Sequence, residues 1–585
     1  MGPPASGGGF FPLSEVKKGM TATAWTVFAG DKPEPMEVEI LGVLRGARGP
    51  GQDMILVQLH GAKPEYTGVV AGMSGSPVYI GNRLLGSLSY RIGQFSKDPI
   101  AGITPIEQML EVRDLPIGAS ENGDQGSEVK DLQTGFRTAG PPEGGMNFQA
   151  METPLVMSGF RPAAIRLWQQ QMAGTGLDVI AAGGVSGSSE SGLDTVPSAK
   201  ALATVVPGSA VSAQLIRGDL EISATCTVTY IDPKQLLACG HPILQAGPVS
   251  LPMTTAEVVA TLASPLNAFK IVNTGQLIGA FTEDRDSAIR GVLGQKPNMI
   301  PVHISVHSPG GDRKLNVEIL DLPSLTWQAL LVTLYNSLLD TNESTEETSY
   351  HLTGSINLDG YPAAPLDEWA SASDAGSAPL ELAMETGGRF TRIYSNSARQ
   401  GAIRAINLDV QAIPRRIQVQ LETARLVSGD IVRAGDTVVV EATVRPWQQA
   451  ARNVRIPFTL PARLAGGNLR ILVSDAGTLD RTLDQPRFSA RPVDLTAVLA
   501  QARRRHAADR IYVSLLVPEA QAGIGGQTLT SLPLSVANAL EPLRSAQDVS
   551  LNGESAAVAG DVPAGGVLNG FQVLNLRIEA GGGLN

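Results

Sequence analysis

A serine flanked by glycines is the residue of this chain best suited to nucleophilic chemistry. Ser74 lies in the motif Gly-Met-Ser-Gly-Ser-Pro at 72–77, between two apolar, strand-like runs at 67–71 and 78–80. Glycine accepts positive φ and lets a substrate approach the backbone closely. A tight turn can also aim the N–H groups of Gly72 and Ser74 at a developing oxyanion. The motif therefore predicts a serine nucleophile, and the alternative interpretation is a Gly-Ser hairpin loop.

A serine nucleophile needs a general base within hydrogen-bond reach, and histidine is the usual one. Of the six histidines, His241 is held most rigidly, in Cys-Gly-His-Pro at 239–242 after a buried strand. His60 closes another apolar strand shortly before the serine motif. His303 and His307 share one face of a strand, which is typical of half-exposed strand residues. A metal pair there would need further ligands, and the sequence offers none.

The serine and histidine segments together resemble the SpoIVB-type serine peptidases, a family grouped with the chymotrypsin-like two-barrel enzymes. The first match is the motif at 72–77, followed by Asn-Arg-Leu-Leu-Gly at 82–86 and Ala-Gly-Ile-Thr-Pro-Ile at 101–106. The second match is Val-Thr-Tyr-Ile-Asp-Pro at 228–233, then Cys-Gly-His-Pro, then Gly-Ala-Phe at 279–281. The resemblance covers residues 10–115 and 200–300. It implies an endopeptidase with Ser74 as nucleophile, His241 as general base and the N–H groups of Gly72 and Ser74 as oxyanion hole.

Two departures from the family pattern concern the catalytic set. The family's histidine segment precedes its serine segment, whereas Ser74 comes first here, so the order looks circularly permuted. Catalysis depends on spatial arrangement and tolerates this. In addition, His60 occupies the place of the family's triad aspartate. The site is then either a triad Ser74–His241–His60 or a Ser–His dyad. Rival orienting acids are Asp53, Asp284 and Asp286, and Ser76 is the rival nucleophile.

The composition favours a chain of many short strands and turns. It has 64 Gly and 39 Pro with 5% aromatic residues, and its 43% apolar content is that of a globular protein. Together with the resemblance, this predicts a mainly β fold: a circularly permuted chymotrypsin-like double β-barrel, then an immunoglobulin-like β-sandwich, then a mixed C-terminal region. Helices are expected over 105–111, 162–172, 325–339, 379–386 and 495–506.

The predicted domains follow the chain in order. They are a Ser-bearing barrel at 10–115, a linker with a short helix at 116–200, a His-bearing barrel at 201–322, a helical or irregular connecting region at 323–410, the sandwich at 411–476 and the mixed region at 477–585. Only Cys226 and Cys239 are present. Diagonal positions on a hairpin are usually too far apart for an unstrained disulfide, so free thiols are predicted.

Several classes of partner are disfavoured. A net charge of −11 without a basic tract argues against nucleic acid. No apolar run reaches membrane-spanning length, and no cofactor or metal motif is evident. The N-terminus lacks a signal-peptide pattern. The family resemblance nevertheless implies a periplasmic or secreted protein, and a cytoplasmic location stays open.

Three functions follow from these observations. The first is a serine endopeptidase whose protein or peptide substrate pairs with the strand at 84–90. The second is a catalytically weak or inactive binding or assembly protein on the peptidase fold, with its β-rich C-terminal half contacting a protein partner. The third is a self-processing peptidase that cuts its own Gly-rich segments at 113–150 or 181–192.

Overall fold

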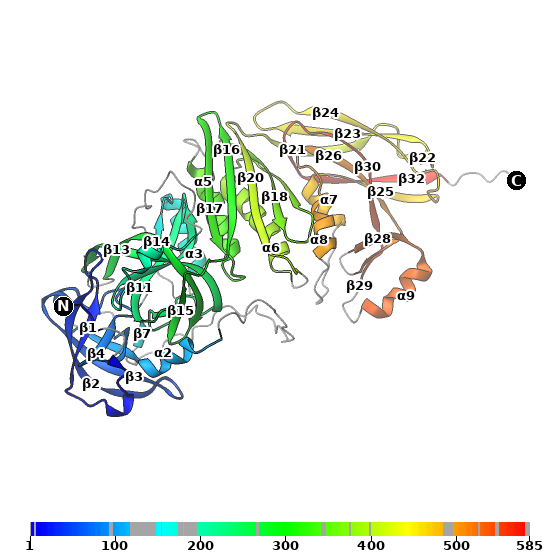
Figure 1. Cartoon of the computed structure of the whole chain (residues 1–585). Helices are drawn as coiled ribbons and strands as arrows, with labels where there is room; N and C mark the ends of the chain where they lie inside the picture. Colours follow the sequence, from blue (N-terminus) through cyan, green and yellow to red (C-terminus); the bar gives the residue numbers. More distant parts are fainter. Residues whose placement is uncertain are drawn as a thin grey trace. The chain divides into compact units, whose positions relative to one another are not determined.

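The structure is a computed structural model in which the described residues are 2–4, 8–92, 98–116, 148–151, 153, 155–173, 179–180, 196–264, 268–340, 347–373, 376–396, 399–483, 495–524, 527–544 and 549–579. The fold is mainly β, with 52% strand and 19% helix, as predicted. The chain forms two compact units (Figure 1). Unit 1 comprises 1–300 and 316–332, and unit 2 comprises 301–315 and 333–585.

Unit 1 begins with a closed six-stranded barrel. Its strands pair in the order β4-β1-β2-β3-β6-β5, and a β4–β5 pairing closes the ring. Period-two alternation places one face of β2 inside the barrel. Val38 and Ile40 are fully buried, while Glu37, which directly precedes Val38, is exposed. The strands are β1 (Thr21–Thr26), β2 (Glu34–Gly49), β3 (Gln52–His60), β4 (Pro77–Ile80), β5 (Arg83–Ile92) and β6 (Ile100–Pro105).

The segment that leads into the serine motif differs from its prediction. The expected strand-like run at 67–71 is wrong, because helix α1 (Ala62–Thr67) occupies its start. Gly68 ends that helix at φ 71°, a left-handed conformation that suits glycine. Only Ala71 then pairs, through an isolated parallel bridge to Phe269. Ser74 therefore lies on a loop between a helix and β4.

A second ring of strands follows in unit 1. Its order is β10-β13-β14-β15-β12-β11, and a β10–β11 pairing joins the two ends. The strands are β10 (Ala210–Gly218), β11 (Glu221–Ile231), β12 (Gln235–Ala238), β13 (Gly247–Leu262), β14 (Phe269–Arg285) and β15 (Ala288–Leu293). Three short strands extend the sheets: β7 (Phe148–Ala150), β8 (Leu155–Ser158) and β9 (Val179–Ile180). The longer strand β17 (Gly311–Leu320) pairs with β10.

Helix α2 (Ile106–Arg113) links the two rings. Arg290 of β15 is 1% exposed, and its guanidinium donates hydrogen bonds to the carbonyl oxygens of Leu115 (2.5 Å) and Val112 (3.4 Å) at the end of this helix. A cation there complements the negative end of the helix dipole. The predicted helix at 162–172 is confirmed as α3 (Pro162–Met172), and α4 is Ala199–Leu202. The predicted linker includes 117–147 and 181–195, which lie outside the described residues.

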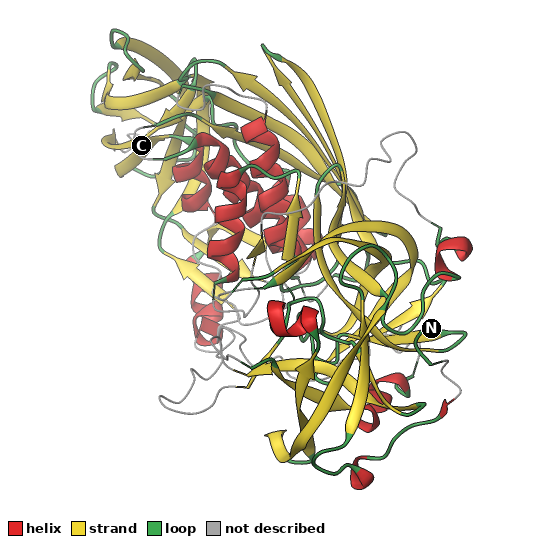
Figure 2. Ribbon diagram, turned by 90° about the vertical axis from the view of Figure 1, so that its left-hand side faces the viewer, coloured by secondary structure: helices red, strands yellow, loops and turns green. Residues whose placement is uncertain are grey.

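Four neighbouring strands of unit 2 lie in the order β19-β18-β20-β16. Helix α6 (Ala378–Tyr394) packs against β18 and β19, and Figure 2 shows the helices of this unit on one side of its sheet. Alternate residues such as Leu352 and Val410 are therefore buried, while the opposite face is polar. The elements are β16 (Met299–Ser308), β18 (Ser349–Leu358), β19 (Ala364–Ala370) and β20 (Ile403–Ile413). Helix α5 (Thr326–Asp340) begins in unit 1 and continues into unit 2 from residue 333.

The rest of unit 2 contains two sheets that share one apolar core, with Val440, Ile471 and Val513 fully buried. The sheets are ordered β24-β23-β21-β31 and β22-β32-β25-β26-β30. Strands after 476 thus complete the layers begun within 411–476. The elements are β21 (Gln418–Leu426), β22 (Ile431–Arg433), β23 (Thr437–Pro446), β24 (Arg452–Thr459), β25 (Gly467–Ser474), β26 (Arg510–Val517), β30 (Ser555–Pro563), β31 (Val567–Asn569) and β32 (Phe571–Glu579).

A small three-stranded sheet and three helices complete unit 2. They are α7 (Ala476–Leu483), α8 (Leu495–Ala502), β27 (Ala520–Ile524), β28 (Gln527–Leu532), α9 (Leu534–Arg544) and β29 (Val549–Asn552). Helix α8 begins at the residue predicted for it and ends earlier. Throughout the described parts of both units, no helix combines the length and apolar character needed to cross a bilayer.

Candidate functional site

The Ser74 turn is built by two glycines in the left-handed region. Gly72 has φ 94° and Gly75 has φ 93°, conformations that glycine adopts without steric cost. A hydrogen bond within the turn stabilises it, because the N–H of Ser76 donates to the carbonyl of Met73 (2.9 Å). The N–H of Gly75 donates to the carbonyl of Leu88 (2.8 Å) on β5. The motif at 72–77 therefore forms a rigid projection from the first barrel.

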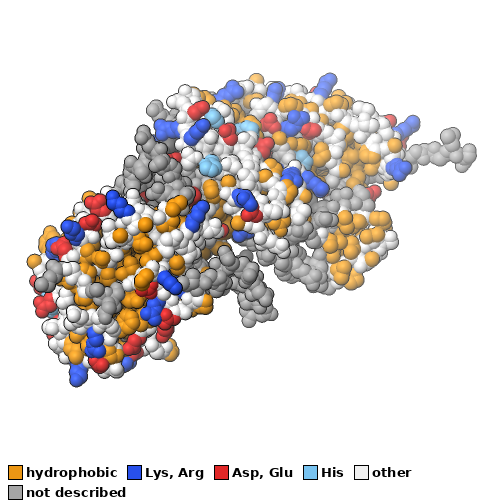
Figure 3. Space-filling model, viewed as in Figure 1, with side chains coloured by type: hydrophobic (Ala, Val, Ile, Leu, Met, Phe, Trp, Pro, Cys, Tyr) orange, Lys and Arg blue, Asp and Glu red, His pale blue; other side chains and the backbone are white. Residues whose placement is uncertain are grey.

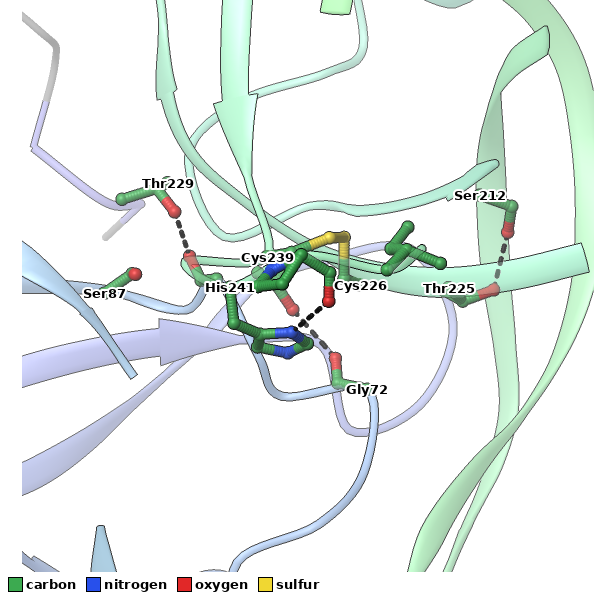
Figure 4. Close-up of a disulfide and its surroundings, with 12 residues drawn as sticks. Gly72, Ser87, Ser212, Thr225, Cys226, Thr229, Cys239 and His241 are labelled. Atoms are coloured by element: carbon green, nitrogen blue, oxygen red, sulfur yellow. Dashed lines mark hydrogen bonds between the residues drawn. A yellow bond between two sulfur atoms is a disulfide. The ribbon is translucent and has the colours of Figure 1, made fainter. Parts of the chain in front are cut away.

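This turn contacts the histidine-bearing hairpin directly, although the two segments are more than 150 positions apart. Thr227 donates its N–H to the carbonyl of Ser74 (2.8 Å) and its hydroxyl to the carbonyl of Gly72 (3.0 Å). Thr229 donates its hydroxyl to the carbonyl of Gly75 (2.7 Å) (Figure 4). A Cβ on Gly75 would lie 1.9 Å from the carbonyl oxygen of Thr227, so only glycine permits this approach.

The first barrel also holds the turn that carries His241. Gly240 has φ 74°, and a Cβ there would lie 2.1 Å from the hydroxyl oxygens of both Ser87 and Ser89 on β5. The hydroxyl of Thr104 on β6 donates to the carbonyl of Gly240 (2.7 Å). The first barrel and the second ring of strands therefore each contact a loop of the other, and the structure brings the predicted serine and histidine segments together in one unit.

Cys226 and Cys239 form a disulfide, so the prediction of free thiols is wrong. Their Cα atoms are 5.2 Å apart, well within bonding range. Two local departures from a regular hairpin explain the error. A register shift between Val228 and Tyr230 displaces β12 relative to β11. In addition, Cys239 lies beyond the end of β12 at φ 66°, which turns its side chain back toward Cys226 (Figure 4).

His241 has the tautomer of a general base. Its Nδ1 is 2.7 Å from the carbonyl oxygen of Pro242, which can only accept, so Nδ1 carries the proton and Nε2 carries the lone pair. The pKa of His241 is lowered to about 4, chiefly by burial and to a smaller extent by Arg48, while the Pro242 carbonyl and Asp286 act in the opposite direction. The ring is therefore neutral at pH 7.

Two buried polar atoms of the site lack a hydrogen-bond partner among the described residues: Ser74 Oγ and His241 Nε2. Ser74 is 0% exposed and His241 is 2% exposed. By contrast, the hydroxyl of the rival Ser76 donates to the carbonyl of Met73 (2.6 Å). Unsatisfied buried groups are rare and often mark function. Ser74 Oγ and His241 Nε2 do not hydrogen-bond to each other, and their burial means that no substrate reaches either atom without movement.

His60 lies elsewhere on the first barrel. Its Nε2 is 3.4 Å from Glu39, its Nδ1 is 4.0 Å from Glu65, and its side chain is 32% exposed. No contact of the described residues joins it to Ser74 or His241. In the structure the orienting partner of His241 is the Pro242 carbonyl. A main-chain oxygen carries no sequence signal of its own, which is why sequence reasoning missed it.

The three rival acids have different surroundings. Asp284 is 2% exposed and accepts the N–H groups of Ile243 (2.8 Å) and Leu244 (2.6 Å), so it fixes the segment directly after His241. Burial raises the pKa of Asp284, and these N–H groups oppose the rise. Asp286 forms an ion pair with Arg48 at 3.5 Å. Asp53 accepts from Arg45 and from the Gly46 N–H, away from the site on the β2–β3 hairpin.

The predicted oxyanion donors are free within the described part of the chain. Neither the N–H of Gly72 nor that of Ser74 donates to a described acceptor. Both N–H groups belong to the turn whose carbonyl groups accept hydrogen bonds from Thr227. The described residues also contain no group of three or more His, Cys, Asp or Glu arranged to bind a metal ion. The chemistry available here is that of a hydroxyl, an imidazole and main-chain N–H groups.

Comparison with known proteins adds no further assignment. The chain matches no protein-family model, no curated protein and no solved structure.

Proposed function

We propose that unit 1 is a serine endopeptidase with Ser74 as nucleophile and His241 as general base. The observation that carries the proposal is the contact of the two predicted segments: Thr227 and Thr229 of the histidine-bearing hairpin hydrogen-bond to the Ser74 turn. Ser74 Oγ and His241 Nε2 are both buried, and neither has a described hydrogen-bond partner. Two rings of strands, each contributing one loop to this site, support a circularly permuted chymotrypsin-like double barrel. The resemblance to SpoIVB-type peptidases supports the same activity.

The reaction uses the tautomer described above. His241 Nε2 takes the proton of Ser74 Oγ as this oxygen attacks the scissile carbonyl carbon. The N–H groups of Gly72 and Ser74 receive the oxyanion. His241 then gives its proton to the leaving amine, and water repeats the sequence on the acyl-enzyme. The Pro242 carbonyl holds the ring, but it stabilises imidazolium less than a carboxylate does, so slow turnover is expected.

Substrate entry requires the site to open. The hydrogen bonds from Thr227 and Thr229 to the Ser74 turn cover the nucleophile with the hairpin that carries His241. The predicted pairing of substrate with the strand at 84–90 is not available in this structure, because β5 pairs with both β4 and β6 over that stretch. Catalysis therefore requires a rearrangement of the turn and the β11–β12 hairpin that exposes Ser74 Oγ and brings His241 Nε2 to it.

Activity-based labelling tests the proposal. A fluorophosphonate probe is expected to label the wild-type chain and Ser76→Ala, but not Ser74→Ala. Ser76→Ala is the matched control, because it removes a hydroxyl from the same turn. Equal labelling of wild type and Ser74→Ala would exclude Ser74 as nucleophile. Mass spectrometry of the labelled peptide identifies the modified residue.

A second candidate function is a binding or assembly protein on a peptidase fold. The complete burial of Ser74 and the low pKa of His241 favour it, because both weaken catalysis. The two-layered β region of unit 2, which we propose is immunoglobulin-like, would then contact a protein partner. Absence of labelling in a folded wild-type chain would support this function. The self-processing alternative predicts cleavage products in the intact mass after prolonged incubation.

The buried disulfide supports a periplasmic or secreted location. Disulfides persist in oxidising compartments and are rare in the cytosol. Cys226 is 1% exposed and Cys239 is 0% exposed, and the bond joins β11 to the His241 turn. Thiol counting on protein isolated from its natural compartment under alkylating conditions tests this location. Two alkylated cysteines in the freshly isolated chain would contradict it.

A further inference from the structure

A buried lysine lies beside the Ser74 turn. Lys270, near the start of β14, donates its N–H to the carbonyl of Ala71 (3.1 Å), and the N–H of Ala71 donates to the carbonyl of Ala268 (2.8 Å). These bonds align β14 with the residues just before the serine. A Cβ on Gly72 would lie 3.2 Å from Lys270 Cδ, so the lysine stem passes directly against Gly72.

The amine of Lys270 is enclosed without a counter-ion among its described contacts. Lys270 is 3% exposed, and its Nζ donates to the hydroxyl of Thr26 (2.8 Å) at the end of β1. The cross-strand neighbour on β13 is Thr261, whose hydroxyl donates to the carbonyl of Phe28. None of these contacts from the turn, β1 or β13 is titratable. Burial alone lowers the pKa of Lys270 to about 7.

A buried, unpaired amine is costly for stability, and such groups concentrate at functional sites. A general base works best when its pKa lies near the working pH. His241 at about 4 is a weak proton acceptor, whereas a lysine with a pKa of about 7 is half deprotonated at neutral pH. Sequence reasoning did not single out Lys270, and the signal that could have found it is the lone lysine in Ala-Phe-Lys-Ile-Val at 268–272.

We infer that Lys270 is the general base for Ser74, with Thr26 holding the amine while the site is closed. The inference rests on the proposed function, with Ser74 as the nucleophile, and it assigns to Lys270 the general-base role given there to His241. On opening, the neutral amine of Lys270 turns from Thr26 to Ser74 and takes the Oγ proton as the Oγ–carbon bond forms. The carbonyl π electrons move to the oxygen. When the carbon–nitrogen bond breaks, the ammonium returns the proton to the leaving amine, and water then releases the acyl group in the same way.

The pH dependence of labelling distinguishes the two bases. In the full wild-type chain, the rate of fluorophosphonate labelling at Ser74 is expected to rise about tenfold per pH unit below a midpoint near pH 7. Lys270→Met is expected to lower the rate at pH 8 by about 100-fold. His241→Gln is expected to keep the midpoint. A wild-type midpoint near pH 4 that His241→Gln abolishes would overturn the role of Lys270 and leave the peptidase intact.

Further variants separate a base from a structural lysine. Lys270→Arg keeps the positive charge but cannot accept a proton, so it is expected to label as slowly as Lys270→Met. Thr26→Val removes the hydroxyl that stabilises the ammonium, and a lower midpoint is expected. An unshifted midpoint in Thr26→Val, with Lys270→Arg labelled at the wild-type rate, would contradict the inference. If Lys270→Met does not fold, the wild-type profile and Thr26→Val still decide. Absence of any Ser74-dependent labelling would instead reject the proposed function.

Discussion

The site of unit 1 and the polar sheet face of unit 2 place the same residue type in opposite environments. His241 is 2% exposed, and its only described hydrogen bond is to a main-chain carbonyl. His307 has a side chain that is 35% exposed, and its ring nitrogens lie 3.0 Å from Asp312 and 3.0 Å from Asp409. Burial lowers the pKa of His241 to about 4, whereas the two carboxylates raise the pKa of His307. Environment, and not residue type, sets the proton affinity.

The packing of the two regions explains this contrast. The site of unit 1 lies between the first barrel and the second ring of strands, whose loops approach each other closely at glycines, so its side chains are buried. On the sheet of unit 2, His303 and His307 project from β16 opposite the buried Ile304 and Val306. Figure 3 shows histidines gathered on this surface of unit 2. An open face permits solvated ion pairs, which contribute little to stability. Changes at the site should therefore cost much more than changes on the sheet face.

The largest effect is expected for Gly75→Ala. The new Cβ would meet the backbone of Thr227 at 1.9 Å and would need φ 93°, so we expect a loss of about 4 kcal/mol in the free energy of unfolding. Gly360→Ala in unit 2 is the matched control, because Gly360 has φ 75° with open space around it. Its cost should be about 1 kcal/mol. Denaturant unfolding of both variants measures the difference, and equal losses would refute the interlocked geometry.

Removal of the disulfide is the next largest change. The double variant Cys226→Ser and Cys239→Ser should lose about 3 kcal/mol of stability, because the bond closes a loop between residues 13 positions apart. The unfolding transition of unit 1 should shift, and that of unit 2 should stay. Calorimetry with and without a reductant provides the measurement. A stable wild-type transition after complete reduction would show that the disulfide does not hold the His241 turn.

Acid should weaken unit 1 through His241. Its folded pKa of about 4 lies below the ordinary value, so the unfolded chain binds a proton first as the pH falls below about 6.5. Stability is therefore lost between pH 6.5 and 4, by about 3 kcal/mol at the lower limit. His241→Gln should lack this slope. Parallel slopes in wild type and variant would contradict the burial of a neutral imidazole.

The smallest effect is expected on the sheet face of unit 2. Asp409→Asn removes one carboxylate from His307, so the pKa of this histidine should fall toward its ordinary value. The stabilisation from the raised pKa is present below the unfolded pKa of His307 and disappears as the pH rises through its folded pKa. Stability at pH 7 should be almost unchanged. NMR titration of His307 gives the pKa, and a large stability loss would mean that this face is not solvated.

The sequence predictions succeeded where the signal lay within one short segment, and they failed where the outcome depended on other parts of the chain. The helix at 162–172 was predicted at its observed bounds, because Pro162 and the apolar spacing lie within one segment. The prediction of a strand-like run at 67–71 was wrong, because helix α1 extends to Thr67 and ends at Gly68. This helix was not predicted from the sequence. Cys226 and Cys239 were separated in the prediction because a register shift cannot be inferred from the alternation of residues. Asp284 was among the acids considered, but its backbone partners depend on the loop conformation.

The sequence by itself determined the residue types at the site: a Gly-flanked serine, a histidine fixed between glycine and proline, and a lone lysine in an apolar strand. It also determined the β-rich character, because alternation and turn residues act within a few positions. Only the tertiary structure decided that these segments come into contact and that Cys226 bonds to Cys239. It also decided that the Pro242 carbonyl orients His241 and that the side chain of Lys270 is buried away from solvent. Burial and close approach arise between segments distant in the chain, so their electrostatic consequences exist only once the first barrel and the second ring of strands have packed together.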